Sequence, residues 1–360
     1  MATFASLQGS NLNDLLLKPL TFQRHAILYP PGRVKGAPEP DVDISFLLRT
    51  DREFDCVGFG LNAVDHLIVV PHYPDFDTKI RFQEYEKSAG GQTASAMVAL
   101  QRLGMSTAYA GRFGSDEDGR FGLLSLEYEG VNLDYVETIA GADNQIAFII
   151  IDERSGERTI IWDRDERLSY RVDEAPIELA SRGRILHLDA HDPPACAVMA
   201  RAAHNAGAIV TADIDNIYEG LPELLPLIDV LITSSEFPQR LTGIGDLRSS
   251  LLEIQSRYGC AIVGATLGAR GAIVYCDGQF VESPSFEVPG GCRDTTGAGD
   301  AFHAGFIYGM LRDEELETCL KLGHAVAALK CRALGGRATL PTADELADFI
   351  GKDSKICEAE

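Results

Sequence analysis

The chain has 360 residues, of which 45% are hydrophobic, enough for one large α/β domain or two smaller ones. Its formal net charge of −22 argues against a general nucleic-acid surface, and no apolar run is long enough to span a bilayer. No signal peptide is recognisable, so we expect a cytoplasmic protein without nucleic-acid or membrane partners. The eight cysteines are scattered without a CxxC pair, which predicts free thiols rather than disulfides or a zinc site.

Residues 1–52 are weakly periodic and contain a Pro- and Gly-rich stretch, which predicts a partly irregular N-terminal extension. Over residues 53–350, apolar runs alternate with helical patterns, which predicts an α/β fold with a mostly parallel central sheet flanked by helices. The expected strands are residues 54–60, 106–114, 184–190, 208–215, 230–235 and 260–268, and the expected helices include 93–104, 194–207, 300–311 and 320–335. Residues 351–360 are expected to form a solvated tail.

Two stretches interrupt this alternation with hairpin patterns, at about residues 66–87 and 145–164, the second turning at residues 153–158. Antiparallel strands inserted into a parallel fold predict a small sheet that projects from the main body. Ligands bind at the carboxyl ends of the parallel strands in such folds, so we interpret the small sheet as a lid over that edge.

The most informative stretch is residues 293–310, RDTTGAGDAFHAGFIYGM. Gly297, Ala298 and Gly299 stand before Asp300, and a nearly all-apolar helical segment follows. A helix that begins here directs its free N–H groups, which carry partial positive charge, at the turn. This arrangement predicts an anion-binding backbone with a carboxylate beside it. The alternative is an ordinary helix start, in which the aspartate only caps the helix.

Two segments resemble the signatures of the PfkB, or ribokinase-like, carbohydrate kinases: residues 294–302, DTTGAGDAF, and residues 90–119, which begin GGQTASAM. The resemblance extends over roughly residues 54–350. It implies a β lid that often pairs between subunits, and transfer of the γ-phosphate of ATP to a hydroxymethyl group with Mg²⁺. In that reaction the 297–299 backbone would stabilise the transferred phosphoryl group, and Asp300 would be the general base.

The resemblance also implies a sugar site. Asp65 matches the acidic residue that accepts hydrogen bonds from sugar hydroxyls, although a surface-loop acid is the alternative. Gly90 and Gly91 match paired glycines whose backbone lies against the sugar. Ser95 stands where the family commonly has an asparagine. A serine has a shorter reach and lacks the amide donors, which leaves open the hydroxyl pattern that this position reads.

Arg158 resembles an arginine in the second lid strand of ketohexokinases, which implies a contact with a sugar oxygen or an anionic substituent. This likeness makes a ketose or a pentose the favoured substrate. The alternative is an exposed charge on a hairpin. Trp162 and Arg164 are further candidates for the site, but strand alternation alone leaves their direction open.

The nucleotide side follows from the same resemblance. The positions expected to lie beside the ATP phosphates and ribose are Thr266, Gly268, Gly271 and Thr296. An ordinary glycine turn between two strands is the alternative for residues 266–271. In many family members a monovalent cation, K⁺, binds nearby through carbonyl and carboxylate oxygens. The corresponding positions in this chain are Asp294, Ala333, Gly335 and Thr339.

One departure from the family pattern concerns the Mg²⁺ site, and one further set of residues could suggest a metal. Family members commonly carry an NxxE motif that helps to organise Mg²⁺, whereas this chain has Ser235 and Pro238 at those positions and an offset Glu236. The Mg²⁺ arrangement is therefore not inherited from that motif. A second set of polar residues, which could suggest a metal but which we expect to border the substrate, comprises His187, Asp189, His191 and Asp192.

The sequence therefore predicts an ATP-dependent sugar kinase of ribokinase-like fold that forms a homodimer through its lid. A nucleoside kinase of the same fold is one alternative, although the sequence offers no clear aromatic sandwich for a base. A non-catalytic sugar or nucleotide sensor is another; the intact GAGD stretch argues against it, and the altered NxxE positions argue weakly for it.

Overall fold

A computed structural model describes residues 48–154 and 156–357, with side chains described as far as residue 351. The predicted N-terminal extension, residues 1–52, lies almost wholly outside the described residues. Among the helices described, none is long and apolar enough to cross a membrane. The cysteines whose side chains are described are free thiols, and all of them except Cys292 are buried.

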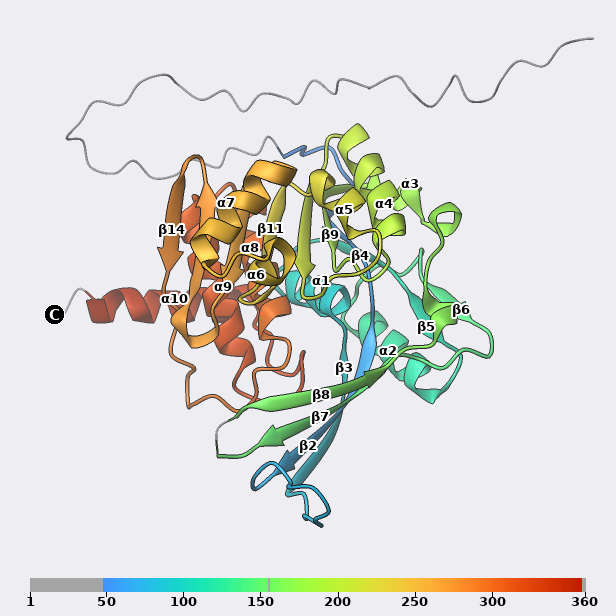
Figure 1. The fold of residues 1–360 in the computed structure, drawn as a ribbon, viewed down its shortest axis with the longest axis vertical. Helices are drawn as coiled ribbons and strands as arrows, with labels where there is room; N and C mark the ends of the chain where they lie inside the picture. Colours follow the sequence, from blue (N-terminus) through green and yellow to red (C-terminus); the bar gives the residue numbers. More distant parts are fainter. Residues whose placement is uncertain (1–47, 155, 358–360) are drawn as a thin grey trace, which may run out of the picture. The chain divides into compact units, whose positions relative to one another are not determined.

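The main sheet has eight strands in the order β14-β13-β12-β11-β10-β9-β1-β4 (Figure 1). Its six parallel strands are β1 (Phe54–Phe59), β4 (Thr107–Ala110), β9 (Gly183–Leu188), β10 (Ile209–Ile214), β11 (Val230–Ser234) and β12 (Ile262–Thr266). Two antiparallel strands complete one edge, namely β13 (Ala272–Cys276) and β14 (Gln279–Ser283). The central strands are buried on both faces and rich in Val, Ile and Ala, as expected for a covered parallel sheet.

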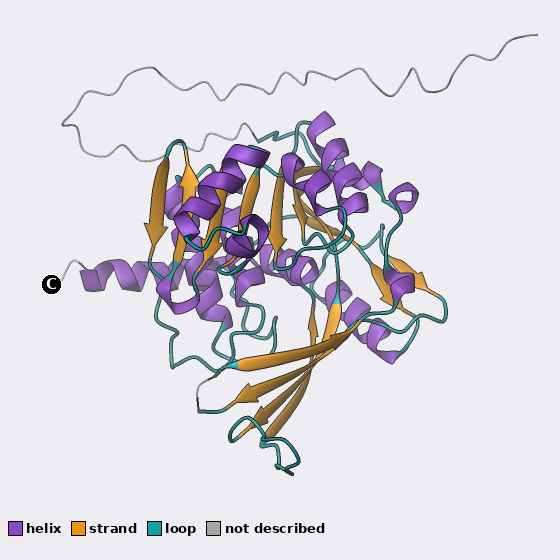
Figure 2. Ribbon diagram, viewed as in Figure 1, coloured by secondary structure: helices purple, strands orange, loops and turns teal. Residues whose placement is uncertain are grey.

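Helices cover both faces of this sheet, and a separate hydrophobic core lies on each side (Figures 1 and 2). One core is built on α1 (Gln92–Arg102), α8 (Ala298–Leu311) and α9 (Leu316–Lys330). The other is built on α3 (Ile177–Ala180), α4 (Pro193–Asn205), α5 (Leu221–Leu224), α6 (Phe237–Thr242) and α7 (Leu247–Tyr258). This three-layer arrangement confirms the predicted fold class.

Helix α8 is buried almost throughout its length and lies unusually close to α9. A Cβ added to Gly305 would lie 2.5 Å from the Leu322 carbonyl oxygen, and one added to Gly309 would lie 2.8 Å from the Cys319 sulfur. From the other side, a Cβ on Gly323 would lie 2.9 Å from the Phe302 ring. These glycines let the two helix backbones approach more closely than alanine would allow.

The two predicted hairpins are present and join into one four-stranded sheet in the order β3-β2-β7-β8. The first hairpin is β2 (Ala63–Val70) with β3 (Glu84–Gly90), and the second is β7 (Ile146–Asp152) with β8 (Arg158–Asp163). Parallel pairing of β2 with β7 connects them. The inner face of this lid buries Leu67, Ile149 and Ile151 together with Leu334 of the main body. Figure 2 shows the sheet projecting below the helices.

Two expected elements differ from the structure. The strand expected over residues 106–114 breaks at Gly111, after which β5 (Arg112–Gly114) leaves the main sheet and pairs with β6 (Glu137–Ile139). A side chain at Gly111 would collide with the Tyr109 hydroxyl, 2.1 Å away.

The final helix, α10 (Ala343–Cys357), continues past residue 350, so the boundary expected for a solvated tail falls inside a helix. Helix α2 (Glu117–Tyr128) begins at Asp116, whose side chain accepts a hydrogen bond from the Gly119 amide.

Candidate functional site

The anion loop, residues 294–299, lies at the start of α8. Gly297 is the N-cap, with a φ of 75°, and a Cβ there would lie 2.7 Å from the Gly336 Cα atom, so only glycine fits this turn. In the first turn of α8 the Ala298 amide donates to the Thr295 carbonyl oxygen at 3.1 Å, whereas the amides of Gly297 and Gly299 have no backbone partner among the described residues and are available for a ligand. The side chain of Thr296 is nearly buried, and its hydroxyl oxygen has no hydrogen-bond partner among the described residues. This orphaned group points to a polar ligand at the loop.

Asp300 stands in the first turn of α8, directly after the anion loop. Burial raises the pKa of Asp300 well above its usual range, and the nearby carboxylates of Asp213 and Asp65 raise it further. Arg337 and Lys330 act in the opposite direction. A carboxylate with a raised pKa is a stronger base than an exposed aspartate, which suits it to removing a proton from an alcohol.

Asp65 comes from lid strand β2, where 6% of its surface is exposed. Burial raises the pKa of Asp65 to about 6, while the Arg337 charge opposes the shift. The predicted paired glycines lie beside it: a Cβ on Gly90 would be 2.3 Å from the Asp65 carboxylate. Gly91, the N-cap of α1, has a φ of 94°, and a Cβ there would lie 2.5 Å from the Asn62 Cα atom. The structure therefore brings Asp65, Gly90 and Gly91 together.

Ser95 is buried on α1 and accepts a hydrogen bond from the Arg337 Nε atom at 3.1 Å. Arg337 also donates from Nη2 to the Gly90 carbonyl at 2.5 Å and from Nη1 to the Ser125 hydroxyl at 3.3 Å. Burial lowers the pKa of Arg337 to about 10, and the charges of Tyr109, Asp65 and Asp300 oppose this shift. A buried guanidinium thus fills the space beside the short serine.

Sequence reasoning missed Arg337. The only available signal was an arginine within the GGRATLP stretch that follows α9, next to the paired Gly335 and Gly336. The Arg337 backbone is anchored as well, because the Arg102 Nη1 atom donates to its carbonyl oxygen at 3.0 Å. This residue therefore connects the loop after α9 to the glycine turn beside Asp65.

The candidate lid side chains contact two different parts of the main body, namely the anion loop and the residues that follow β9. Arg158, at the start of β8, is exposed and donates from Nη1 to the Thr295 hydroxyl of the anion loop. Trp162 lies 6.1 Å from the ring of His191, which places it on the side of the main sheet. Arg164 pairs with Asp192 at 3.2 Å and donates to the Leu168 carbonyl. In this structure Arg158 thus touches the anion loop, next to Thr296.

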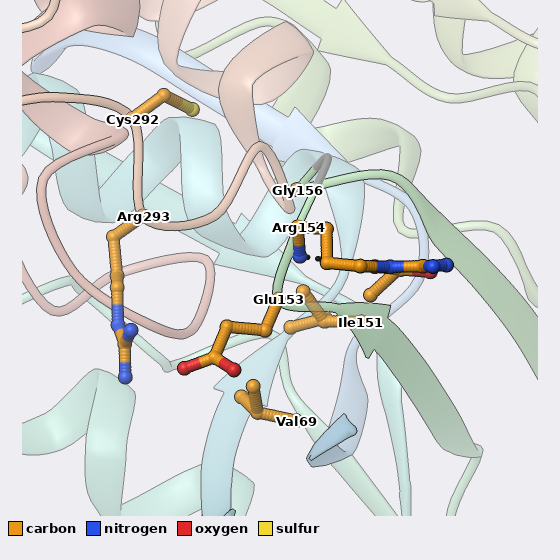
Figure 3. A pocket seen from close by; sticks show the side chains of 8 residues that line it. Val69, Ile151, Glu153, Arg154, Gly156, Cys292 and Arg293 are labelled. Atoms are coloured by element: carbon orange, nitrogen blue, oxygen red, sulfur yellow. Dashed lines mark hydrogen bonds and ion pairs between the residues drawn. The ribbon is translucent and has the colours of Figure 1, made fainter. Parts of the chain in front are cut away.

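The lid is also held at its other edge. Arg293, directly before the anion loop, forms an ion pair with Glu84 of β3. Since β3 and β8 are the two edge strands of the lid, the loop contacts both edges. A cavity of about 150 Å³ lies between the lid turn and the residues directly before this loop, Cys292 and Arg293. In Figure 3, the Glu153 carboxylate and the Arg293 guanidinium lie in the same part of the view. Asp300 does not line this cavity.

The polar ends of β9 and β10 form a second part of the site. Asp189 is fully buried and accepts hydrogen bonds from the Leu61 amide at 2.7 Å and the Thr93 hydroxyl at 2.9 Å. Asp213 is paired with His303 of α8 at 3.3 Å. Burial acts to raise the pKa of Asp213, but His303, together with His187 and Gln92, outweighs it and the net shift is downward. Asp213 is therefore held ionised close to Asp300.

Aromatic groups gather at the same edge. The ring of His191 lies 4.9 Å from that of Tyr218, and both nitrogens of His191 are buried without a partner among the described residues. Burial lowers the pKa of His191, which favours the neutral ring. Burial, together with Asp213 and Asp189, raises the pKa of Asp215 to about 6. Asp215 and Tyr218 had no signal in the sequence beyond their place after a strand.

The predicted metal-like set does not form a metal site. His187 is fully buried, contacts the Thr211 hydroxyl at 2.9 Å, and has a pKa that burial lowers to about 3. Asp192 accepts from Arg164 and from the Tyr170 amide. Within the described part of the chain, no group of three or more His, Cys, Asp or Glu side chains is placed to hold a metal ion.

Three of the four residues expected on the nucleotide side lie at the end of β12 and in the turn that follows it, whereas Thr296 belongs to the anion loop. Thr266 ends β12, and Gly268 opens the short turn that follows. Gly271 has a φ of 93°, and a Cβ there would lie 1.9 Å from the Ser283 carbonyl oxygen, so the close turn requires glycine. A Cβ on Gly268 would meet nothing within 4 Å, which leaves open space beside this turn. At the altered NxxE positions, Glu236 is exposed and Pro238 is buried.

The positions expected to hold a monovalent cation surround a lysine. Lys330 and Asp294 are both fully buried, and the Lys330 ammonium donates to the Asp294 carbonyl oxygen at 3.0 Å. The Asp294 carboxylate accepts from the Gly335 amide at 2.9 Å. Thr339 donates from its hydroxyl to the Lys330 carbonyl oxygen at 2.6 Å. Ala333 is half-buried in the same loop.

Comparison with known proteins identifies the family of the chain. The family model described as pfkB family carbohydrate kinase matches residues 55–343. A ribokinase of Haemophilus influenzae is 27% identical over 298 residues, which cover 81% of this chain and 96% of that protein. An uncharacterized sugar kinase of Archaeoglobus fulgidus is 32% identical over 269 residues, covering 68% of this chain and 98% of that protein. The structure of Arabidopsis thaliana ribokinase complexed with ribose and ATP, 23% identical, superposes with a TM-score of 0.69 and covers 82% of this chain and 98% of its own.

Proposed function

Because the chain belongs to the pfkB family of carbohydrate kinases, we propose that it transfers the γ-phosphate of ATP to a hydroxyl group of a small sugar, a ketose or a pentose. The observation that carries the proposal is the position of Asp300. It stands in the first turn of α8, beside the anion loop and within electrostatic reach of Asp65. A carboxylate base, an anion-binding backbone and a second carboxylate that can bind hydroxyl groups thus lie close together.

The residues suggest a division of labour. Asp65 accepts hydrogen bonds from sugar hydroxyls and orients the acceptor. Asp300 takes the proton of the attacking hydroxyl. The amides of residues 297–299, with the Thr296 hydroxyl, stabilise the charge that spreads over the transferred phosphoryl oxygens. The product is a sugar phosphate, ADP is the leaving group, and the proton resides on Asp300 until it passes to solvent.

ATP would bring Mg²⁺ on its phosphates, where the ion neutralises their charge. The described residues offer no group of three or more acidic, His or Cys side chains that is placed to hold a metal ion. We therefore expect the nucleotide phosphates and water, rather than a protein cage, to hold the ion.

A nucleoside is the second candidate acceptor. His191, Tyr218 and Trp162 form an aromatic group at the carboxyl ends of the strands, which is suited to stacking on a base. A nucleoside kinase of Methanothermobacter thermautotrophicus, 24% identical, is among the relatives. The preference for a ketose depended on a sugar contact by Arg158, whereas its guanidinium bonds to Thr295 here.

The test is phosphate transfer from ATP to a panel of ketoses, pentoses, aldoses and nucleosides. We expect Asp300→Asn to lower kcat on the best acceptor by about 10²- to 10⁴-fold, because a general base is lost, with little change in ATP affinity. Asp313→Asn is the matched control, since this aspartate is exposed at the other end of α8. Near-normal turnover in Asp300→Asn would exclude its role as the base, and a lack of transfer to every acceptor would favour a sensor.

A further inference from the structure

Lys330 is the last residue of α9, and its side chain is fully buried. Its ammonium donates to the Asp294 carbonyl oxygen at 3.0 Å and lies 3.7 Å from the Asp294 Oδ2 atom. Asp294 is also fully buried. A charge in such a place is stable only when it is paired and hydrogen-bonded, so each residue depends on the other.

Asp294 passes this contact on to the anion loop. Its Oδ1 atom accepts a hydrogen bond from the Thr296 amide at 2.8 Å, and its Oδ2 atom accepts from the Gly335 amide at 2.9 Å. The carboxylate thereby joins the anion loop to the loop after α9. Thr339 fixes the other side, because its hydroxyl donates to the Lys330 carbonyl oxygen.

These contacts do not fit a bound monovalent metal ion. The carbonyl and carboxylate oxygens of Asp294 that such an ion would use already face an ammonium group. The Thr339 carbonyl oxygen accepts from Arg332 at 3.3 Å. A second cation beside the ammonium would be repelled by it, and the low polarity of the buried site strengthens that repulsion.

We propose that the Lys330 ammonium is the built-in cation of the anion loop, so that this kinase orders the loop and binds ATP without K⁺. The ammonium and K⁺ both carry one positive charge and both bind oxygen atoms, but the lysine is tethered and always present. Its charge also acts on Asp300 and Asp65, the two acids of the proposed reaction. The inference rests on the proposed function in that it concerns the same ATP site.

The first test needs no substitution. ATP affinity is measured by calorimetry in choline, sodium and potassium chloride at matched ionic strength, and phosphate transfer is measured in the same salts. We expect values within about twofold of one another, because the ammonium leaves no charge for an added ion to supply. A tenfold or greater tightening of ATP binding in potassium over choline would overturn the proposal.

Two variants of the same residue sharpen the test. In Lys330→Ala, space is left beside Asp294 and an ion can enter; in Lys330→Met, the space is filled without charge. We expect both to weaken ATP binding by about ten- to a hundredfold in choline, since a buried carboxylate loses its partner. Potassium should restore ATP binding and thermal stability in the alanine variant only. Lys321→Ala is the control, because Lys321 lies on the same helix but is only half-buried.

The outcomes separate this inference from the proposed function. If ATP binds equally in every salt but no acceptor is phosphorylated, the proposed function fails and the built-in cation stands. If phosphate is transferred only in potassium, the proposed function stands and the built-in cation fails. Should both variants fail to fold, the salt series on the unmodified protein still decides.

Discussion

Arg337 is the residue that most changes the expected chemistry of the site. Its guanidinium donates to Ser95, to the Gly90 carbonyl and to Ser125, so it supports the turn against which the acceptor is proposed to lie. An arginine has five fixed donors and remains charged when buried. It therefore supplies rigid support and a positive charge beside Ser95, where the family commonly has a neutral asparagine that provides only hydrogen bonds.

The burial of Asp65 predicts a pH dependence of acceptor binding. Asp65 can accept hydrogen bonds from hydroxyls with both oxygens only when ionised, and burial raises its pKa to about 6. As the pH falls through 6, Asp65 becomes protonated and acceptor affinity should fall, by about tenfold per pH unit at the limit. Calorimetric titration of the acceptor between pH 5 and 8 measures this without turnover. A flat profile would show that Asp65 does not bind the acceptor as a carboxylate.

Arg337→Met tests the source of the effect. The Arg337 charge lowers the pKa of Asp65, so its loss should raise that pKa. The fall in acceptor affinity at low pH, the acid limb of the profile, should then begin at a higher pH. A purely structural role would lower the melting temperature and leave the limb in place. Lys87→Met is a suitable control, because this lysine of lid strand β3 forms an ion pair with Asp118 of α2.

At the level of elements, the lid and the anion loop form one mechanical unit. The edge strands β3 and β8 reach the loop through Glu84–Arg293 and Arg158–Thr295. Movement of the lid over the acceptor is thereby connected to the loop that is proposed to hold the phosphates. Such a connection lets binding of either substrate favour closure for the other.

The Arg158 contact can be tested by a double-mutant cycle. If Arg158 acts only by bonding to Thr295, Arg158→Ala and Thr295→Val should each raise the acceptor KM by about three- to tenfold. The double variant should then raise the acceptor KM no more than either single variant, because both substitutions remove the same interaction. Additive effects would instead mean that Arg158 contacts a substrate directly. The KM for ATP is the parallel measurement, since a contact to the phosphates would raise it as well.

Much of the site could be predicted where neighbours in the sequence make it. The anion loop and Asp300 lie within seven consecutive positions, and the two hairpins have local turns, so periodicity and turn residues were sufficient. Arg337 and Lys330 could not be found in this way. Arg337 meets Ser95 across 242 positions, and Lys330 meets Asp294 across 36. Those contacts depend on how the loop after α9 folds back, which no local pattern encodes.

At the scale of the whole molecule, the outer face of the lid remains apolar. Its exposed side chains include Ile161 of β8, Phe148 of β7 and Tyr85 of β3. Cross-strand pairing places Ile161 beside Phe148, and the ring of His66 contacts both Phe148 and Tyr85. Exposed apolar bands of this kind on a thin sheet commonly mark an interface.

We therefore expect two copies to pair through this band as a homodimer. Light scattering at micromolar concentration should give twice the mass of the chain, and Phe148→Glu should give a single copy because a charge would be buried in the interface. Ile160→Glu is the matched control, since Ile160 pairs with the buried Ile149 and so lies on the opposite face of the lid. A monomeric mass for the unmodified chain would contradict the expectation.

The close contact between α8 and α9 has a consequence for heat inactivation. Gly305, Gly309 and Gly323 bring the backbones of these two helices into close contact. The end of α8 that bears Asp300 therefore cannot move away from α9 without separating the two backbones. The lid, by contrast, is a thin sheet held by contacts at its two edge strands and by one small apolar cluster, and its opening is a local event. Gradual warming should therefore first impair substrate capture, while the machinery at the start of α8 survives until the domain itself melts. Loss of the catalytic end and loss of the fold would then be a single event.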